Sequence, residues 1–492
     1  MLHTIAIKSL RISALFIAAV LFSRCYSVVR QEQKKETATY QTNALAISTS
    51  SQSNSCSACT YVVPLRQHIT DGKILGIKPG DIICLQASLK YGPLKFINIH
   101  GTEENPIIIT NCGGVVNINV PDKRFALKTE RSSHFRITGT GDKNNRYGIR
   151  LSGSRGIGLT LDLLSTNFEV DHLEVYNIGF AGIMAKTDPS CNDETIRENF
   201  TMKNISLHDN FIHDTGGEGF YIGNSFYAKG MNKKECGIRL PHSILGARIY
   251  NNTVKNAGWE AIQVGSVIEG AEIFNNIIEN YGVRDKANQR GGIQLGEGTG
   301  GLCYNNKIIN GNGNGMTVLG IGDNVIFNNM IVNAGRNGVF CDERSIIGPG
   351  FKFINNTIIS PKMDGIKIYA DLVEMNVIVN NIIVNPGTYA EYKSNFFKSA
   401  DDAYVNKLSD NVKINLSHNL FIQELNEVHF SNPDSMDFSI TKKSPAVDQG
   451  RDVSEFNILF DFNGFPRPYN KIWDIGAFEY APGNNPSNDH SH

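Results

Sequence analysis

The sequence predicts an all-β solenoid, a parallel β-helix of stacked coils of roughly 23 residues with loop insertions. Short runs rich in Ile, Val and Phe alternate apolar and polar positions, as strands with one buried face do. Gly and Asn separate these runs, and one template recurs along the chain. Within the repeats no stretch of about ten residues keeps the 3.6-residue period of a helix.

The template reads apolar-x-apolar-Asn-Asn-x-apolar-apolar, then a Gly/Asn turn, then Gly-apolar-x-apolar. A glycine or an alanine opens its last strand, which puts successive coils in register. A period in this range is typical of a solenoid, and longer spacings between register positions indicate insertions. The register positions are Gly182, Gly219, Ala261, Gly292, Gly315, Gly338 and Gly365.

Pairs of asparagines recur at the turn of each coil. Asn and Gly supply the left-handed conformations that redirect a chain between sheet faces, and stacked Asn side chains can form an amide ladder. We therefore assign these residues a structural role. The pairs are Asn251/Asn252, Asn275/Asn276, Asn305/Asn306, Asn328/Asn329, Asn355/Asn356 and Asn380/Asn381.

The last strand of each coil alternates between an inward and an outward side chain. The inward positions are expected to form the core, and the outward ones a column along one face. The inward set is Ile183, Ala185, Phe220, Ile222, Ile262, Val264, Ile293, Leu295, Met316, Val318, Val339, Cys341, Ile366 and Ile368, and the outward column is Met184, Tyr221, Gln263, Gln294, Thr317, Phe340 and Lys367.

The N-terminus is typical of an exported protein. Residues 1–27 contain a basic start and an apolar run too short to span a bilayer, which indicates a signal peptide. Cys25 stands where a lipoprotein cysteine would, although Arg24 precedes it, so simple secretion and anchoring at the outer membrane or cell surface both stay open. Residues 28–58 are polar and predict a flexible tether.

The rest of the chain divides into a β-helix over residues 59–440, a closing segment over 441–480 and a disordered tail over 481–492. Export permits disulfides. We expect Cys191 and Cys236, in two polar insertions, to be able to pair, and most other cysteines to be buried thiols. The formal net charge of -1 gives no basic footprint for a nucleic-acid partner, and a monomer is expected.

Two segments carry a resemblance. The start PGDIICLQASLKYGPLKFINIHGTEENPIIITNCGG and the end SPAVDQGRDVSEFNILFDFNGFPRPYNKIWDIGAFEY resemble the first coils and the closing element of secreted bacterial right-handed parallel β-helix proteins of the pectate-lyase-like superfamily. With the repeats, the resemblance covers roughly residues 60 to 480. It implies a right-handed solenoid, but this scaffold carries lyases, hydrolases, epimerases and non-catalytic proteins.

Candidate site residues gather along the outward column. Insertions at about residues 187–200, 224–242 and 282–290 are expected to wall a groove there, and acids, amides and aromatic rings suit sugars. The candidate catalytic residues are Glu218, Glu260, Arg290 and Lys367, and the candidate substrate-binding residues are Tyr221, Trp259, Gln263, Gln294, Asp342, Arg344 and Tyr369.

Glu218 and Glu260 each precede a register position, so in adjacent coils their carboxyl groups would lie about 5 Å apart. Such a pair suits the acid and nucleophile of a retaining glycosidase, since one pKa would rise. The same pair could hold calcium, and an ordinary exposed turn is the third alternative. No cofactor is otherwise predicted.

A second mechanism is elimination from a uronic-acid polymer, which needs a base and a group that neutralises the substrate carboxylate. Arg290, Lys286, Lys367 or Tyr221 could share those roles, and a solvated charged loop is the alternative. His208 and His213 are expected to be surface or turn residues. The sequence thus favours binding and cleavage of an extracellular polysaccharide by a lyase or glycoside hydrolase, with a non-catalytic adhesin-like, glycan-binding or structural β-helix protein as the alternative.

Overall fold

The computed structural model describes residues 56–482 except 322, 345–347 and 396–398. The chain divides into two units, Met1–Gln52 and Ser53–His492, and every element described here belongs to the second. The predicted signal peptide with Cys25, the tether up to residue 55 and the tail from residue 483 lie outside the described residues. No helix within the described part is long and apolar enough to cross a membrane.

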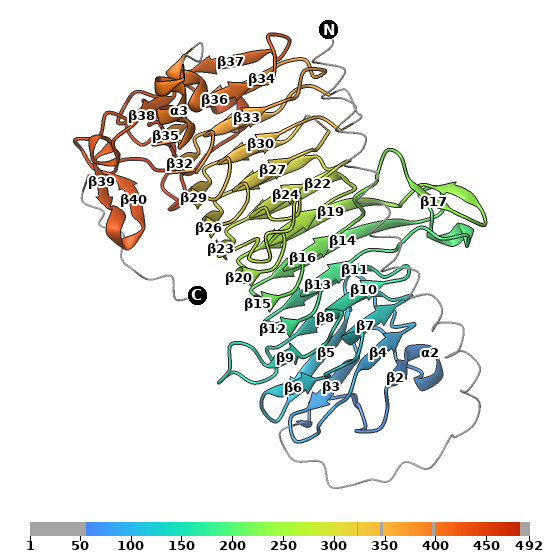
Figure 1. The fold of residues 1–492 in the computed structure, drawn as a ribbon. Helices are drawn as coiled ribbons and strands as arrows, with labels where there is room; N and C mark the ends of the chain where they lie inside the picture. Colours follow the sequence, from blue (N-terminus) through green and yellow to red (C-terminus); the bar gives the residue numbers. More distant parts are fainter. Residues whose placement is uncertain (1–55, 322, 345–347, 396–398, 483–492) are drawn as a thin grey trace. The chain divides into compact units, whose positions relative to one another are not determined.

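The second unit is a right-handed parallel β-helix, as predicted. Three parallel sheets of 13, 12 and 11 strands run through its described residues, and from β5 onward successive strands of the stack enter the three sheets in turn (Figure 1). We name them sheets A, B and C. Sheet A contains β1 (Tyr61–Val62), β3 (Ile82–Gln86), β5 (Ile107–Cys112), β8 (Ser133–Thr138), β11 (Thr166–Asp171), β14 (Thr201–His208), β19 (Ser243–Tyr250), β22 (Val267–Phe274), β25 (Gly301–Tyr304), β28 (Val325–Phe327), β31 (Lys352–Ile354), β34 (Asn376–Val379) and β37 (Ile414–Ser417).

Sheet B, which carries the candidate site, follows sheet C in each coil from β6 onward. Sheet B contains β2 (Ile69–Asp71), β4 (Leu94–Ile97), β7 (Phe125–Glu130), β10 (Ile157–Asp162), β13 (Ile183–Ala185), β16 (Phe220–Ile222), β21 (Ile262–Val264), β24 (Ile293–Leu295), β27 (Met316–Val318), β30 (Val339–Cys341), β33 (Ile366–Ile368) and β36 (Val405–Lys407). Sheet C contains β6 (Val116–Asn119), β9 (Ile149–Ser152), β12 (Leu173–Ile178), β15 (Phe211–Thr215), β20 (Thr253–Ala257), β23 (Ile277–Glu279), β26 (Lys307–Gly311), β29 (Met330–Ala334), β32 (Thr357–Ile359), β35 (Ile382–Val384) and β38 (Leu420–Ile422).

The remaining elements are short and lie in loops or near the ends. The hairpin of β17 (Met231–Lys233) and β18 (Gly237–Arg239) stands out beside the stack (Figure 1). The others are α2 (Gly72–Leu75), η2 (Asp193–Thr195), α3 (Thr388–Ser394), η3 (Ala400–Ala403), η4 (Leu425–Val428), β39 (Phe430–Asn432), η5 (Pro433–Ser435), β40 (Asp437–Ile440) and η6 (Ser454–Phe456).

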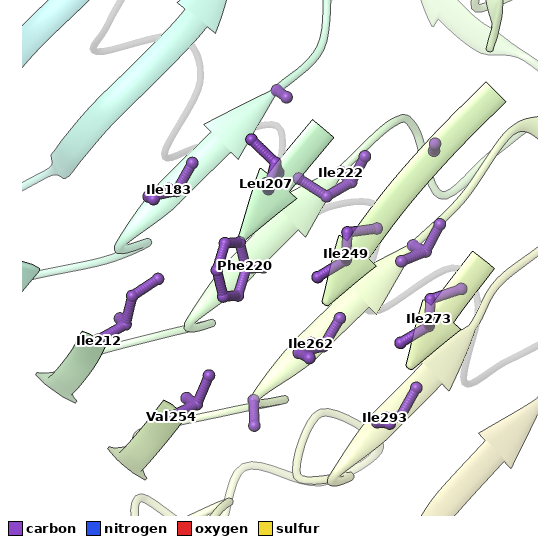
Figure 2. Packing of buried hydrophobic residues seen from close by; sticks show 14 of the residues in the cluster. Ile183, Leu207, Ile212, Phe220, Ile222, Ile249, Val254, Ile262, Ile273 and Ile293 are labelled. Atoms are coloured by element: carbon purple, nitrogen blue, oxygen red, sulfur yellow. The ribbon is translucent and has the colours of Figure 1, made fainter. Parts of the chain in front are cut away.

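The interior is a stack of aliphatic and aromatic side chains in register. Ile183 pairs with Phe220, which pairs with Ile262, and that residue pairs with Ile293; all four are 0 % exposed (Figure 2). The predicted inward set is therefore the core. A Cβ at Gly315 would lie 2.3 Å from a methyl group of Ile331 and 2.6 Å from the carbonyl oxygen of Gly338, so close coil packing explains this register glycine.

The asparagine ladder is confirmed, and it is longer than predicted. The second Asn of each pair is buried and donates its side-chain amide to the next, for example from Asn306 to Asn329 and from Asn329 to Asn356, each at 3.0 Å. Asn210 and Asn419 extend the ladder beyond the predicted pairs. The first member of each pair takes a left-handed φ between 51° and 56°, as for Asn328 and Asn380.

The cysteines correct part of the prediction. Cys191 and Cys236 do form a disulfide, and Cys303 and Cys341 are buried thiols, as expected. However, Cys56 is bonded to Cys112 and Cys59 to Cys84. Cys56, which the sequence placed in the tether, is thus part of the folded start of the solenoid, because its partner is in β5.

Candidate functional site

The outward column of sheet B has the predicted register. Tyr221 pairs with Gln263 and Gln263 with Gln294; the column then runs through Thr317 and Phe340 to Lys367. Adjacent parallel strands are about 4.8 Å apart. Side chains from neighbouring coils can therefore act together, whereas those from coils that are several steps apart cannot.

Glu218 and Glu260 lie at stacked positions just before β16 and β21. The backbone N–H of Gly219 donates to the carbonyl oxygen of Glu260 at 3.0 Å, so the two coils are adjacent. The side chains are 0 % and 1 % exposed. Within the described structure, both carboxyl oxygens of Glu218 and Oε2 of Glu260 have no hydrogen-bond partner. The exposed-turn alternative for this pair is therefore wrong.

Burial sets the protonation of this pair. It raises the pKa of Glu218 to about 7, although the charges of Lys186 and Lys286 oppose the rise. Burial also raises the pKa of Glu260 well above its usual range, and the neighbouring Glu218 carboxylate raises it further. Like charges in a dry site oppose the second ionisation, so Glu260 holds its proton more tightly once Glu218 is ionised.

Lys186 is a functional candidate that the sequence analysis missed. It directly follows β13, is 5 % exposed, and its Nζ lies 3.0 Å from Asp188 and 4.3 Å from the centre of the Tyr221 ring. Burial lowers its pKa to about 8. The available signal was its place directly after the last residue of the strand, the position at which Asp342 and Tyr369 were singled out in later coils.

Tyr221 and Gln263 point outward, but they are covered. Both are 4 % exposed, and both contact Ser225, at 3.1 Å from the Tyr221 hydroxyl and 2.9 Å from the Gln263 amide. On the other side, the ring of Phe180 meets Tyr221 and Trp259 edge-on. The expectation that Tyr221 and Gln263 line the groove is wrong, because an insertion folds over the column at these coils.

Beyond this cover the column opens into a groove. A cavity of about 320 Å³ lies on the outer face of sheet B from Glu260 to Tyr369, and we call it the groove. Four of the predicted residues besides Glu260 and Tyr369 lie in its wall. Its lining residues are Glu260, Asn288, Arg290, Gly291, Gln294, Asn314, Thr317, Leu319, Arg336, Asn337, Phe340, Arg344, Lys367 and Tyr369.

Cations dominate the charged groups of the groove. Arg290, Arg336, Arg344 and Lys367 line it, against the single carboxyl group of Glu260. Arg290 and Arg336 also line a second cavity of about 370 Å³ with Lys362. The proximity of the two arginines helps burial to lower the pKa of Arg290. Arg290 already pairs with Asp285, which lines the second cavity as well, so an anionic group at the two arginines would compete with that carboxylate.

The other predicted residues are spread along the helix axis. Lys367 is four strand spacings from the coil of Glu260, roughly 19 Å, so the two cannot act on one bond. Lys367 lies 3.3 Å from Asp364 and over the ring of Tyr369. Asp342 is buried at the end of β30, and the ring centre of Trp259 lies 3.3 Å from Nζ of Lys286.

The calcium alternative for Glu218 and Glu260 gains no support from their surroundings. The charged neighbours that act on the pair are the ammonium groups of Lys186 and Lys286. Calcium instead takes six to eight oxygen ligands and is repelled by nearby cations. We derive no step through a metal ion.

A second cluster of acids and imidazole lies on the outer face of sheet A. His208 is 8 % exposed, which corrects the expectation of a surface residue, and it contacts Asp209 at 2.7 Å and Glu169 at 3.0 Å. Burial would lower its pKa, but these hydrogen bonds raise it to about 9. Glu169, Asp171 and His208 lie close enough for a metal. A protonated imidazole bonded to acids instead makes this an ion-pair network.

A comparison with protein-family models agrees with the fold. A family model described as a right handed beta helix region matches residues 236–401. The solved structures that are similar include an alginate lyase from Paenibacillus sp. (16 % identity, 74 % of this chain and 99 % of that chain, TM-score 0.37) and a lacto-N-biosidase from Eubacterium ramulus (12 %, 74 % and 68 %, 0.46). A pectate lyase is 12 % identical over 83 % of this chain and 90 % of its own, with a TM-score of 0.42. No curated protein sequence matches the chain.

The fold and the site together define a right-handed parallel β-helix protein with a cationic groove on the outer face of sheet B. The right-handed parallel β-helix that the resemblance implied is confirmed.

Proposed function

We propose that this protein binds a uronic-acid polysaccharide in the groove and cleaves it by β-elimination. One observation carries the proposal: four cationic side chains, several amides and two aromatic rings line a groove that has one carboxyl group of raised pKa at its end. Arginine binds carboxylates through two parallel hydrogen bonds, and aromatic rings and amides suit sugar rings and hydroxyls.

The reaction centre in this proposal is Glu260 with Arg290. Both line the groove at neighbouring coils, and Arg336 stands close to Arg290. The arginines bind the substrate carboxylate and so acidify the proton on the adjacent carbon. The ionised form of Glu260, a minority at neutral pH because the pKa of this carboxyl group is raised, takes that proton and is a stronger base than an ordinary carboxylate.

The electrons of the broken C–H bond form a carbon–carbon double bond, and the bond from the sugar to the glycosidic oxygen breaks. The proton then passes from Glu260 to that oxygen, so one carboxyl group serves both steps. Lys367 and Tyr369, roughly 19 Å along the axis, bind a more distant sugar of the same polymer. Glu218, which is wholly buried behind Glu260, tunes its partner's protonation.

The test uses the purified protein on alginate, polygalacturonate and neutral glycans. We expect ultraviolet absorbance from the unsaturated uronate product on an acidic polymer. Glu260→Gln should lower the rate by about 10²–10⁴, since glutamine cannot exchange the proton. Glu272→Gln, on the outer face of sheet A where Glu272 pairs with Arg248, is the matched control and should keep full activity.

New reducing ends without that absorbance would instead indicate a glycoside hydrolase and overturn the elimination. Binding without cleavage would support the glycan-binding alternative. Full activity of Glu260→Gln would remove Glu260 from the mechanism.

We also propose that the protein works outside the cytoplasm. The three disulfides Cys56–Cys112, Cys59–Cys84 and Cys191–Cys236 support this, because such bonds persist in oxidising compartments. An N-terminal signal with or without a lipid at Cys25 fits the same location. Mass spectrometry of the mature N-terminus would distinguish secretion from lipid anchoring and would contradict export if residue 1 is retained.

A further inference from the structure

The outer column of sheet B changes abruptly from covered to open. Met184, Tyr221 and Gln263 are 8 %, 4 % and 4 % exposed. The next positions of the same column, from Gln294 through Thr317, Phe340 and Lys367 to Asn406, are all partly exposed. One end of the groove therefore lies at the coil of Glu260, and we call this end the stop.

One side of this stop is built by residues 223–242, which we call the wall. Its Ser225 contacts Tyr221 and Gln263 across two coils. Farther along, the N–H of Ala228 donates to Glu297 at 3.2 Å, and the Tyr227 ring lies against Gly298. The wall thus crosses sheet B from the coil of β16 to the coil of β24.

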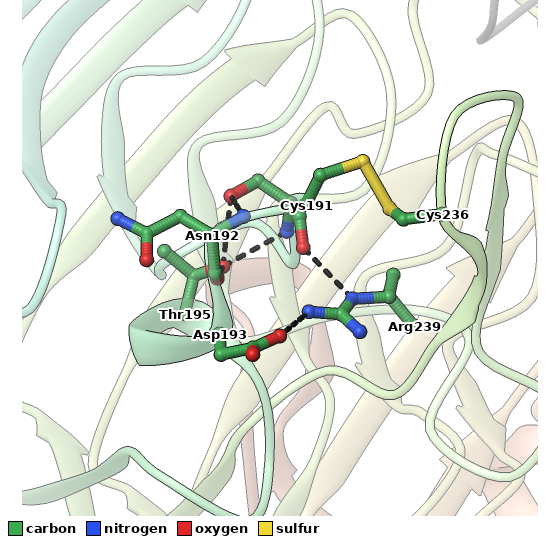
Figure 3. Close-up of a disulfide and its surroundings, with 7 residues drawn as sticks. Cys191, Asn192, Asp193, Thr195, Cys236 and Arg239 are labelled. Carbon is green, nitrogen blue, oxygen red and sulfur yellow. Dashed lines mark hydrogen bonds and ion pairs between the residues drawn. A yellow bond between two sulfur atoms is a disulfide. The ribbon is translucent and has the colours of Figure 1, made fainter.

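The wall is held in place by the preceding insertion. Cys191 and Cys236 join the two insertions, and Arg239 of the wall donates to the carbonyl oxygen of Ser190 at 3.0 Å and pairs with Asp193 (Figure 3). The guanidinium group of Arg197 stacks over the Tyr227 ring at 3.8 Å. These covalent, ionic and stacking contacts make the wall a fixed part of the groove.

The opposite side of the stop comes from other coils. Phe180 contacts both Tyr221 and Trp259, and Lys286 of the insertion at 282–290 lies on the Trp259 ring. Glu218 and Tyr221 are therefore enclosed from two sides. These contacts cover the column up to the coil of Glu260, where the lining of the groove begins.

We propose that the groove is a blind-ended site that binds the end of an acidic polysaccharide chain, so that the protein acts from chain ends rather than within the chain. This inference rests on the proposed function and specifies its substrate. The terminal sugar lies against the stop beside Glu260, and the chain leaves past Lys367. From β24 to β33 the open column spans three strand spacings, about 14 Å, which holds a short run of sugars.

Binding stoichiometry tests this directly. Size-fractionated alginate and polygalacturonate of increasing length are titrated by calorimetry into the Glu260→Gln variant, which leaves the polymer uncut. We expect the number of protein molecules bound per polymer chain to stay at about one as the length increases, because one stop accepts one chain end. With the unaltered protein, product absorbance should rise well before viscosity falls.

A wall variant sharpens the result. Replacement of residues 226–238 by a short Gly-Ser linker, together with Cys191→Ser, should open the stop and make the bound protein per chain rise with length. The matched control shortens the exposed loop 141–146, between β8 and β9, and should keep one protein per chain. If the wall variant fails to fold by circular dichroism, the stoichiometry of the Glu260→Gln protein decides alone.

Binding that rises in proportion to chain length without any change to the wall would overturn the inference and leave the proposed function intact. Cleavage with an early fall in viscosity would do the same. Failure to bind either acidic polymer would overturn the proposed function and the inference with it.

Discussion

The inner stack and the outer column of sheet B are formed by the same strands. The inner positions keep apolar residues from coil to coil, whereas the outer positions do not. In β24, Ile293 is 0 % exposed and pairs with Ile262 and Met316, while its neighbour Gln294 lines the groove. Inside, one apolar residue follows another from coil to coil. Outside, Met184, Tyr221, Gln263, Thr317, Phe340 and Lys367 stand at equivalent positions.

The difference has a physical cause. Each inner side chain must fill the same space between neighbouring coils, since interiors are close-packed and penalise a change of volume or a buried charge. An outer side chain contacts only the insertion that covers it or a ligand. The regular inner side chains thus maintain the spacing of the coils, and the irregular outer side chains supply the candidate functional groups.

The largest expected effect comes from an exchange across one strand. Ile293→Asp should lower the free energy of unfolding by on the order of 5 kcal/mol, because it leaves an unpaired charge in the stack. Gln294→Asp should cost less than about 1 kcal/mol, since that side chain faces the groove. Urea unfolding of both variants measures the contrast. Equal losses would break the distinction between the two faces.

The pH dependence of stability tests how far the covering residues exclude water from Glu218 on the outer face. Burial raises the pKa of Glu218 to about 7, so the folded protein holds this proton more tightly than the unfolded chain does. The contribution of this bound proton to the stability of the folded protein is fully present below about pH 4.5. It is lost as the pH rises through about 7. A shift of this size corresponds to about 3 kcal/mol.

Glu218→Gln should remove that loss and so be more stable than the parent protein at pH 8 but not at pH 4. Unfolding in urea across this pH range measures the effect, and Glu272→Gln should follow the parent. A parent whose stability changes with pH just as that of Glu218→Gln does would show that Glu218 is hydrated rather than enclosed.

The amide ladder gives a smaller effect at the edge of the inner stack. Asn329→Ala should cost about 2 kcal/mol, because buried groups of Asn306 and Asn356 lose a partner. Asn117→Ala, on the exposed side of β6, should change stability by a few tenths of a kcal/mol. Thermal unfolding distinguishes the two, and a mild effect at Asn329 would mean that the ladder follows the coils without stabilising them.

Much of the fold could be predicted because each coil repeats local signals. The Asn pairs gave the turns, the register glycines gave the spacing, and the alternation at Ile293 and Gln294 gave the direction of the side chains. The prediction that Glu218 and Glu260 lie in adjacent coils followed from the same register. Lys186 was missed, since nothing local distinguishes it from other charged residues at strand ends.

The sequence by itself thus determined the coil, its register, the inner stack and the asparagine ladder, because these depend on contacts between equivalent positions of neighbouring repeats. Only the tertiary structure decided which outer positions are enclosed. The contacts of Ser225 with Tyr221 and Gln263 come from an insertion that follows no repeat, and the burial of Lys186 lies beside another. Where a non-repeating loop folds depends on shape and charge across several coils, and no local pattern in the sequence records that.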